Sequence, residues 1–178
     1  MLTILFYLSA TVAIIATFMV ITRYHAVHAL LYLVVSFLAI AMIFFTIGAP
    51  FIAALEVIIY AGAIMTLFIF VIMMFSLGTS TINQEKIWLT PKTWLGPSIL
   101  TFVLLVQFIL IIIEDGNQAS TFEVIEPKDV GLSLFTKYLL GVELSGMLLL
   151  AGIVGAYHLG KRKKNVLHRY LKMGKNNG

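Results

Sequence analysis

Two carboxylates, Glu56 and Glu143, lie inside strongly apolar stretches of the sequence. An ionisable side chain in an apolar span must be hydrated, paired or protonated, and it marks an ion or proton path by default. Tyr60 follows Glu56 by four residues, so a regular helix would bring both side chains to one face. These three residues are the candidates for a proton path. The competing interpretation is that each carboxyl only fastens an interface by hydrogen bonding.

A run of small residues, Ala61-Gly62-Ala63, follows this polar pair. Small side chains let another helix approach closely, and glycine weakens the preference for a regular α-helix. A polar pair beside such a turn is a site where a π-bulge can form, and a bulge would rotate the downstream residues around the helix axis. From these residues alone, a plain packing face is the favoured interpretation.

Other chemistry finds little support in the sequence. The chain has no cysteine, which excludes disulfides, thiolate zinc sites and cysteine-ligated iron–sulfur clusters within it. His28 and His158 are the only histidine pair near one depth that could ligate a haem, but histidines at helix ends beside the membrane interface explain them better. Neither a phosphate-binding loop nor a hydrolase triad is recognisable. No metal or cofactor site is predicted.

The elements that must position these residues are membrane helices. Hydrophobic residues make up 61% of the chain and charged residues 11%, against about 45–50% and about 25% in soluble domains. About 20 apolar residues are needed to cross a bilayer. The sequence predicts an all-α integral membrane protein in which residues 1–160 form one five-helix domain and residues 161–178 a basic tail. The predicted spans are 2–22, 26–47, 51–77, 95–113 and 134–159.

The basic residues predict the orientation of these spans. Ten of the 12 Lys and Arg residues fall on one side of the membrane, seven of them in the tail. Positive charge in short loops marks the cytoplasmic side. We therefore expect the N-terminus outside and the C-terminus inside, and we interpret the tail as a topology signal beside lipid rather than a nucleic-acid site. Glu56 and Glu143 would then lie about 8 Å and about 14 Å from the outer ends of their helices, where they could share a water file.

The fifth predicted span is rich in small residues. Close helix–helix contacts in membranes use such residues at intervals of four. The pattern indicates that the chain is part of a larger assembly rather than a free monomer. The residues expected to pack are Gly141, Ser145, Gly152, Ala156 and Gly160.

Three segments together resemble a known family. They are VHALLYLVVSFLAIA at 27–41, ALEVIIYAGAIMTLFIFVIMMFSLG at 54–78 and VELSGMLLLAGIVGAYHLG at 142–160. The sequence is similar, up to about Gly160, to the subunit J family of bacterial proton-pumping NADH:quinone oxidoreductase (respiratory complex I), whose mitochondrial counterpart is chain 6. The resemblance implies a multi-pass subunit of the bacterial inner membrane, beside subunits of the A, H, K and N types. It also implies that flavin, iron–sulfur clusters and quinone belong to partner subunits, with no redox centre or catalytic activity in this chain alone.

The family's third helix carries a π-bulge that forms and relaxes on the path from quinone chemistry to proton movement. Carried over to this sequence, the resemblance assigns the switchable turn to Tyr60, Ala61, Gly62, Ala63 and Ile64, with Glu56 one turn earlier. Thr66 departs from the family, where Val often stands.

The expected function is to help couple quinone reduction to proton translocation through a hydrated polar path and a switchable third helix. The first alternative is a purely structural or assembly subunit of the same membrane arm. The second is a small independent channel, and a haem protein is a remote third.

Overall fold

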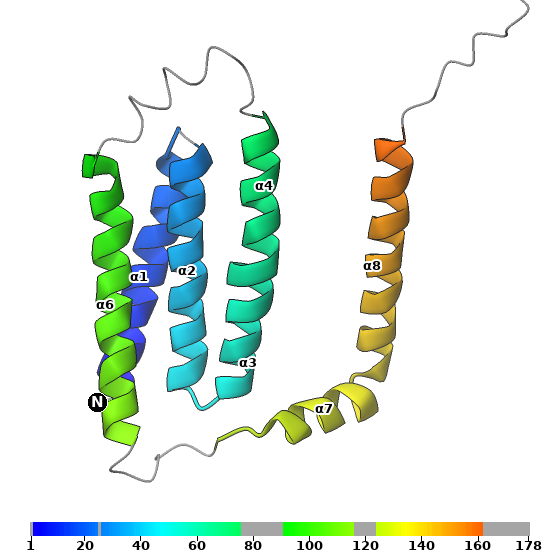
Figure 1. Cartoon of the computed structure of the whole chain (residues 1–178). Coiled ribbons are helices and arrows are strands. Elements are labelled where there is room, and N and C mark those ends of the chain that lie inside the picture. The colour runs from blue at the N-terminus through cyan, green and yellow to red at the C-terminus, as the bar shows by residue number, and fades with distance from the viewer. Residues whose placement is uncertain (1, 25, 76–90, 116–123, 162–178) are drawn as a thin grey trace, which may run out of the picture. The chain divides into compact units, whose positions relative to one another are not determined.

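The computed structural model describes residues 2–24, 26–75, 91–115 and 124–161. Within the range 91–115, side chains are described for residues 94–113. All regular structure in these ranges is helical, and five helices are long and apolar enough to cross a membrane (Figure 1). The prediction of an all-helical chain with five candidate spans is confirmed. Those spans are Leu2–Thr22, Ala26–Thr46, Pro50–Phe75, Trp94–Ile113 and Leu139–Gly160.

The third span is not uniform along its length. It begins as an α-helix, α3 (Pro50–Leu55), continues as a π-helical segment, η1 (Glu56–Ile64), and returns to an α-helix, α4 (Met65–Phe75). The other elements are α1 (Leu2–Thr22), α2 (Ala26–Thr46), α6 (Pro91–Asp115), α7 (Pro127–Thr136) and α8 (Leu139–Gly160). The chain divides into two compact units, Met1–Pro127 and Lys128–Gly178.

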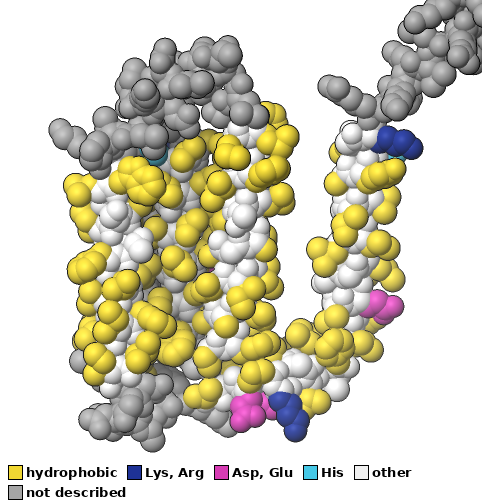
Figure 2. All heavy atoms as spheres, viewed as in Figure 1, with side chains coloured by type: hydrophobic (Ala, Val, Ile, Leu, Met, Phe, Trp, Pro, Cys, Tyr) yellow, Lys and Arg dark blue, Asp and Glu magenta, His cyan; other side chains and the backbone are white. Residues whose placement is uncertain are grey.

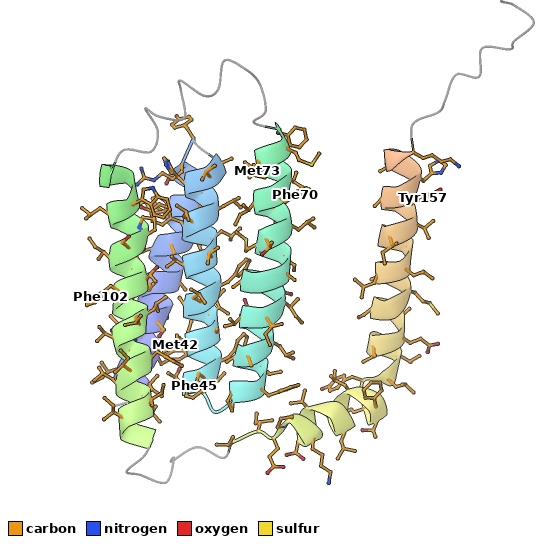
Figure 3. All side chains as sticks on the ribbon, in the orientation of Figure 1. Met42, Phe45, Phe70, Met73, Phe102 and Tyr157 are labelled. Carbon is orange, nitrogen blue, oxygen red and sulfur yellow. The ribbon has the colours of Figure 1, made fainter. Side chains whose placement is uncertain are left out.

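In the first unit α2 contacts α1, α6 and all three parts of the third span. The core lies between α1, α2 and α6, where Ala16 and Ala39 are completely buried and let the helix backbones approach. Larger side chains such as Met42, labelled in Figure 3, fill the space around these alanines. The buried residues of the core are Leu5, Val12, Ala16, Val35, Ala39, Met42, Leu104 and Ile111.

The turn between α2 and the third span is closed by backbone hydrogen bonds. Ala49 N–H donates to Phe44 O at 3.0 Å and Gly48 N–H to Phe45 O at 3.2 Å, the paired bonds of a Schellman motif. Gly48 has a φ of 84°, a conformation that glycine adopts without strain. Pro50 then opens α3, where its fixed φ suits the first helical turn. Ile125 N–H also donates to Gly48 O, at 3.0 Å.

In the second unit the structure corrects the start of the fifth span. We expected one helix over 134–159, but residues 134–136 belong to α7 and the spanning helix α8 begins at Leu139. Between them the N–H groups of Lys137 and Tyr138 both donate to Ser133 O, which turns the chain. The polar pair Thr136-Lys137 separates two apolar runs that a hydropathy window averages into one. Residues 162–178 of the predicted tail lie outside the described residues.

Hydrophobic side chains project along the whole visible length of α4 and α6 (Figure 2). Phe70 on α4 is 54% exposed within the chain, and Phe102 on α6 is 65% exposed. These outward aromatic rings, labelled in Figure 3, suit lipid or neighbouring membrane helices as surroundings.

Candidate functional site

Glu56 is the first residue of the π-helical segment η1. Its side chain is partly buried, while its neighbours Val57, Ile58 and Ile59 are exposed. Within the part of the chain that the structure describes, the Glu56 carboxyl group makes no hydrogen bond or ion pair. A carboxyl group in an apolar span needs a partner, water or a proton. The group is therefore available to water or to partners other than the described residues.

Tyr60 connects η1 to α2. Its ring lies 5.5 Å from that of Phe37, centroid to centroid, with a 50° angle between the planes. Offset and tilted aromatic pairs stabilise a contact beyond the apolar area that they bury. Tyr60 remains 46% exposed. One part of the ring thus holds the π segment against α2 while another part stays accessible.

Gly62 lies in η1 where the backbone leaves little room for a side chain. A Cβ atom added at this residue would lie 3.2 Å from the carbonyl oxygen of Val57. The two residues are five apart, which is the hydrogen-bonding interval of a π-helix. The same turn carries a side-chain bond, since the Thr66 hydroxyl donates to the Gly62 carbonyl at 2.6 Å. The glycine therefore allows a close backbone approach that a larger residue would disturb.

Glu143, the other candidate carboxylate, lies on α8 in the second unit and is exposed there. Because α8 begins at Leu139, Glu143 lies only about 6 Å along the axis from the start of its helix, and not about 14 Å as expected. Glu56 lies about 9 Å from the start of its span at Pro50. Each carboxyl group is thus near the N-terminal end of its span. A water file shared by the two stays a prediction.

The small residues of α8 have open space around them within the described part of the second unit. A Cβ atom added at Gly141, Gly152 or Gly160 would find no atom within 4 Å, and Ala156 is exposed. Ser145 uses its hydroxyl within the helix, donating to Gly141 O at 2.7 Å. Their predicted role in packing against other helices stays a prediction.

Sequence reasoning missed a buried polar contact between α1 and α6. The Gln107 amide nitrogen donates to Leu5 O at 3.0 Å, and the Ser9 hydroxyl donates to the Gln107 amide oxygen at 3.3 Å. Ser9 is completely buried and Gln107 is 2% exposed. The signal in the sequence was a single amide inside the apolar run LLVQFILIII. A partly buried bond of 2.8 Å between the hydroxyls of Thr17 and Ser36 joins α1 to α2.

An aromatic contact at the other end of the same bundle was also missed. The Arg23 guanidinium lies 5.5 Å from the centroid of the Tyr32 ring, a cation–π distance. The Tyr32 hydroxyl lies where a Cβ atom on Gly96 would stand, so this position of α6 accepts only glycine without a shift of the ring. Arg23 thus has a structural contact within the chain besides the role in membrane orientation that the sequence predicts.

In the described ranges, no group of three or more His, Asp or Glu side chains could hold a metal ion. The chemistry that these ranges offer is that of one accessible carboxyl group beside a π-helical turn, together with buried amide and hydroxyl contacts. Proton exchange and hydrogen bonding are therefore the processes that the third span can support.

Comparisons with known proteins show the family to which the chain is similar. A family model described as NADH-ubiquinone/plastoquinone oxidoreductase chain 6 matches residues 16–159. The chain is similar to NADH-quinone oxidoreductase subunit J of Pseudomonas aeruginosa, with 53% identity over 158 residues that cover 88% of this chain and 95% of the relative. It is 50% identical over 159 residues to subunit J of Escherichia coli K12, covering 89% and 86% of the two chains. Subunit J of Buchnera aphidicola subsp. Schizaphis graminum is 48% identical over 159 residues, covering 89% and 98%.

Proposed function

Because this chain belongs to the NADH-ubiquinone/plastoquinone oxidoreductase chain 6 family, we propose that it helps couple quinone reduction to proton translocation within NADH-quinone oxidoreductase. The chain is a membrane subunit of that multi-subunit oxidoreductase. Membership of the complex sets aside the interpretation as a small independent channel. The question that remains is what the third span contributes.

The observation that carries the proposal is the π-helical segment Glu56–Ile64, which begins at a carboxyl group that has no partner among the described residues. A π-helical turn inside an α-helix has a regular α form as its alternative, and the two forms point the downstream side chains in different directions. Glu56 exchanges protons with, or hydrogen-bonds to, groups of a hydrated path. Tyr60, Ala61, Gly62, Ala63 and Ile64 switch between the two forms and so control the continuity of that path.

Coupling needs a two-state element that a distant site can bias. The third span is such an element in this proposal, and reduction of quinone in a partner subunit supplies the bias. Glu143, close to the start of α8, is a second carboxyl group on the path.

The surroundings of the chain complete the proposal. The N-terminus lies outside and the C-terminus in the cytoplasm, because basic residues gather on one side of the spans. The membrane is the bacterial inner membrane. The neighbours are subunits of the A, H, K and N types, and flavin, iron–sulfur clusters and quinone lie in partner subunits. Gly141, Ser145, Gly152, Ala156 and Gly160 of α8 pack against these neighbours.

Glu56→Gln in the intact complex tests the coupling role. Membranes that carry the variant are assayed for NADH oxidation and quinone-dependent proton pumping, and assembly is checked on a native gel. We expect an assembled complex whose pumping per NADH, or whose turnover, falls severalfold, because glutamine keeps the shape of the side chain but cannot release a proton. Glu126→Gln makes the same chemical change at an exposed residue outside the spans and should leave both activities unchanged.

Normal assembly with normal pumping would refute the role of Glu56. Loss of assembly in Glu56→Gln would favour the alternative, in which the chain is a structural subunit on which the larger membrane subunits dock.

A further inference from the structure

The short helix α7 separates its polar and apolar side chains onto two faces. Polar residues recur along it at intervals of four and three, which places them on one stripe of the helix. That stripe consists of Asp129, Ser133 and Thr136. The opposite face is apolar and contains Val130, Leu134 and Phe135. The helix is less apolar and more amphipathic than any of the spanning helices, so it has the character of a surface helix and not of a sixth span.

The apolar face of α7 needs a covering surface. Phe135 is 66% exposed and Leu134 is 40% exposed. The helix has 10 residues, and isolated helices shorter than about 12–15 residues are only marginally stable in water. A helix of this length is stabilised mainly by burying its apolar side. The residues that cover this side must therefore be replaced by another apolar phase wherever the second unit does not supply them.

The position of α7 in the chain points to the membrane surface as that phase. Lys128 and all later residues of α7 belong to the second unit together with α8. The helix ends at Thr136, and α8, a candidate span, begins at Leu139. The chain thus enters the membrane directly after α7, and the turn at residues 137 and 138 is fixed by two backbone bonds to Ser133 O.

The direction of α7 agrees with this position. Figure 1 shows α7 turned away from the axis of α8, as expected for a helix that lies along a surface while its neighbour crosses the bilayer. In Figure 2 the charged side chains near the start of α7 lie on the edge away from the direction in which α8 runs. If α8 runs into the hydrocarbon, this charged edge faces water and the apolar face points towards lipid.

The two ends of α7 carry the side chains that suit a layer of phospholipid headgroups. Lys128 is the second residue of the helix, and Lys137 follows its last residue. The Lys137 Nζ atom lies 5.6 Å from the centroid of the Tyr138 ring. Tyrosine is enriched at the level of the headgroups, and lysines there can reach phosphate groups while their stems lie along apolar surface. Charge and apolar surface therefore fit the same partner.

We propose that α7 is an interfacial helix whose apolar face, Val130, Leu134 and Phe135, lies in the headgroup layer where α8 enters the membrane, with phospholipid as its partner. This surface is separate from the third span. The proposal therefore does not depend on the coupling role of Glu56.

The test is a photoreactive benzoylphenylalanine in place of Phe135, in the intact complex within native membranes. After irradiation the subunit is isolated, and mass spectrometry shows whether it has gained the mass of a phospholipid or has been joined to a protein. The matched control carries the same photoreactive residue in place of Ser133, on the polar stripe of the same helix. We expect the yield of phospholipid adduct to be severalfold higher at residue 135 than at residue 133, because only the apolar face reaches the acyl chains.

A crosslink from residue 135 to another subunit, or to another segment of this chain, in place of the lipid adduct would show that protein covers the apolar face and would overturn the proposal. Equal yields of lipid adduct at the two positions, or none at residue 135, would also overturn it. If the variant at residue 135 fails to assemble, the photoreactive residue in place of Leu134 tests the same face. The same outcomes then support or refute the proposal.

Discussion

The bundle of α1, α2 and α6 and the third span handle polar groups in opposite ways. In the bundle, Ser9 and Gln107 bond each other, and Gln107 also bonds the backbone of α1. In the third span, Glu56 has no partner among the described residues, and Tyr60 keeps nearly half of its surface exposed. Both regions belong to spans of similar hydropathy. Polar side chains in the bundle therefore hold helices together, whereas the carboxyl group of Glu56 is left without a partner among the described residues.

This comparison predicts that substitutions in the bundle reduce the stability of the subunit, whereas substitutions at Glu56 change activity and not stability. The largest stability effect is expected at Gly96. Gly96→Ala would push the Tyr32 ring out of its place between α2 and α6, and overpacking of this kind costs about 1–3 kcal/mol. The temperature at which the detergent-solubilised complex loses half of its activity should fall. Gly131→Ala in α7 is the control, because a Cβ atom there meets nothing within 4 Å.

Tyr32→Phe checks the cause of that loss. Removing the hydroxyl that lies over Gly96 should restore part of the stability in the double variant Gly96→Ala/Tyr32→Phe. The control is the loss of stability that Tyr32→Phe causes on its own. If Tyr32→Phe causes the same loss of stability when it is added to Gly96→Ala, the two residues do not interact and the explanation is wrong.

The next effect is expected at Gln107. Gln107→Leu removes both bonds between α1 and α6 and leaves Leu5 O and the Ser9 hydroxyl to find other partners. Side-chain bonds between membrane helices contribute about 0.6–2 kcal/mol. The inactivation temperature should fall by less than in Gly96→Ala. Ser9→Ala should lower the inactivation temperature of the unsubstituted chain, and it should lower that of the Gln107→Leu variant much less. An equal fall in both backgrounds would show that Ser9 and Gln107 are not in contact.

The smallest stability effect is expected for Glu56→Gln. Its carboxyl group bonds no other described residue, so the change should stay within about 0.5 kcal/mol, as for other positions without specific contacts. The same measurement of the inactivation temperature applies, now with Gln107→Leu as the destabilised reference. A loss of stability as large as that of Gln107→Leu would break the distinction between the two regions and show that Glu56 fastens an interface.

The five candidate spans could be predicted from the sequence because length and hydropathy alone determine whether a segment can cross a membrane. The break at Lys137 and Tyr138 could not, because a window of apolar residues averages across a turn that two backbone hydrogen bonds make. The contact of Ser9 with Gln107 joins residues 98 positions apart, and no periodicity within one helix reports such a pairing.

The candidate site also has some features that could be predicted from the sequence and others that could not. Glu56 and Tyr60 could be picked out because their residue types are costly or unusual in an apolar span. The bounds of the π-helical segment, Glu56–Ile64, could not, because the side chains alone do not specify where it begins and ends. The orientation of the termini, the switch between helix forms and the roles of Glu56, Tyr60 and Glu143 stay predictions.

The hydrogen bond from the Ile125 N–H to the Gly48 carbonyl affects which residues homologues can carry at these two positions. Both of its atoms belong to the main chain, so the attachment of this segment to the turn before the third span does not depend on the side chain at residue 125. Every amino acid except proline brings the same donor to that position. This hydrogen bond therefore tolerates any side chain except that of proline at residue 125, whereas Gly48 needs its positive φ.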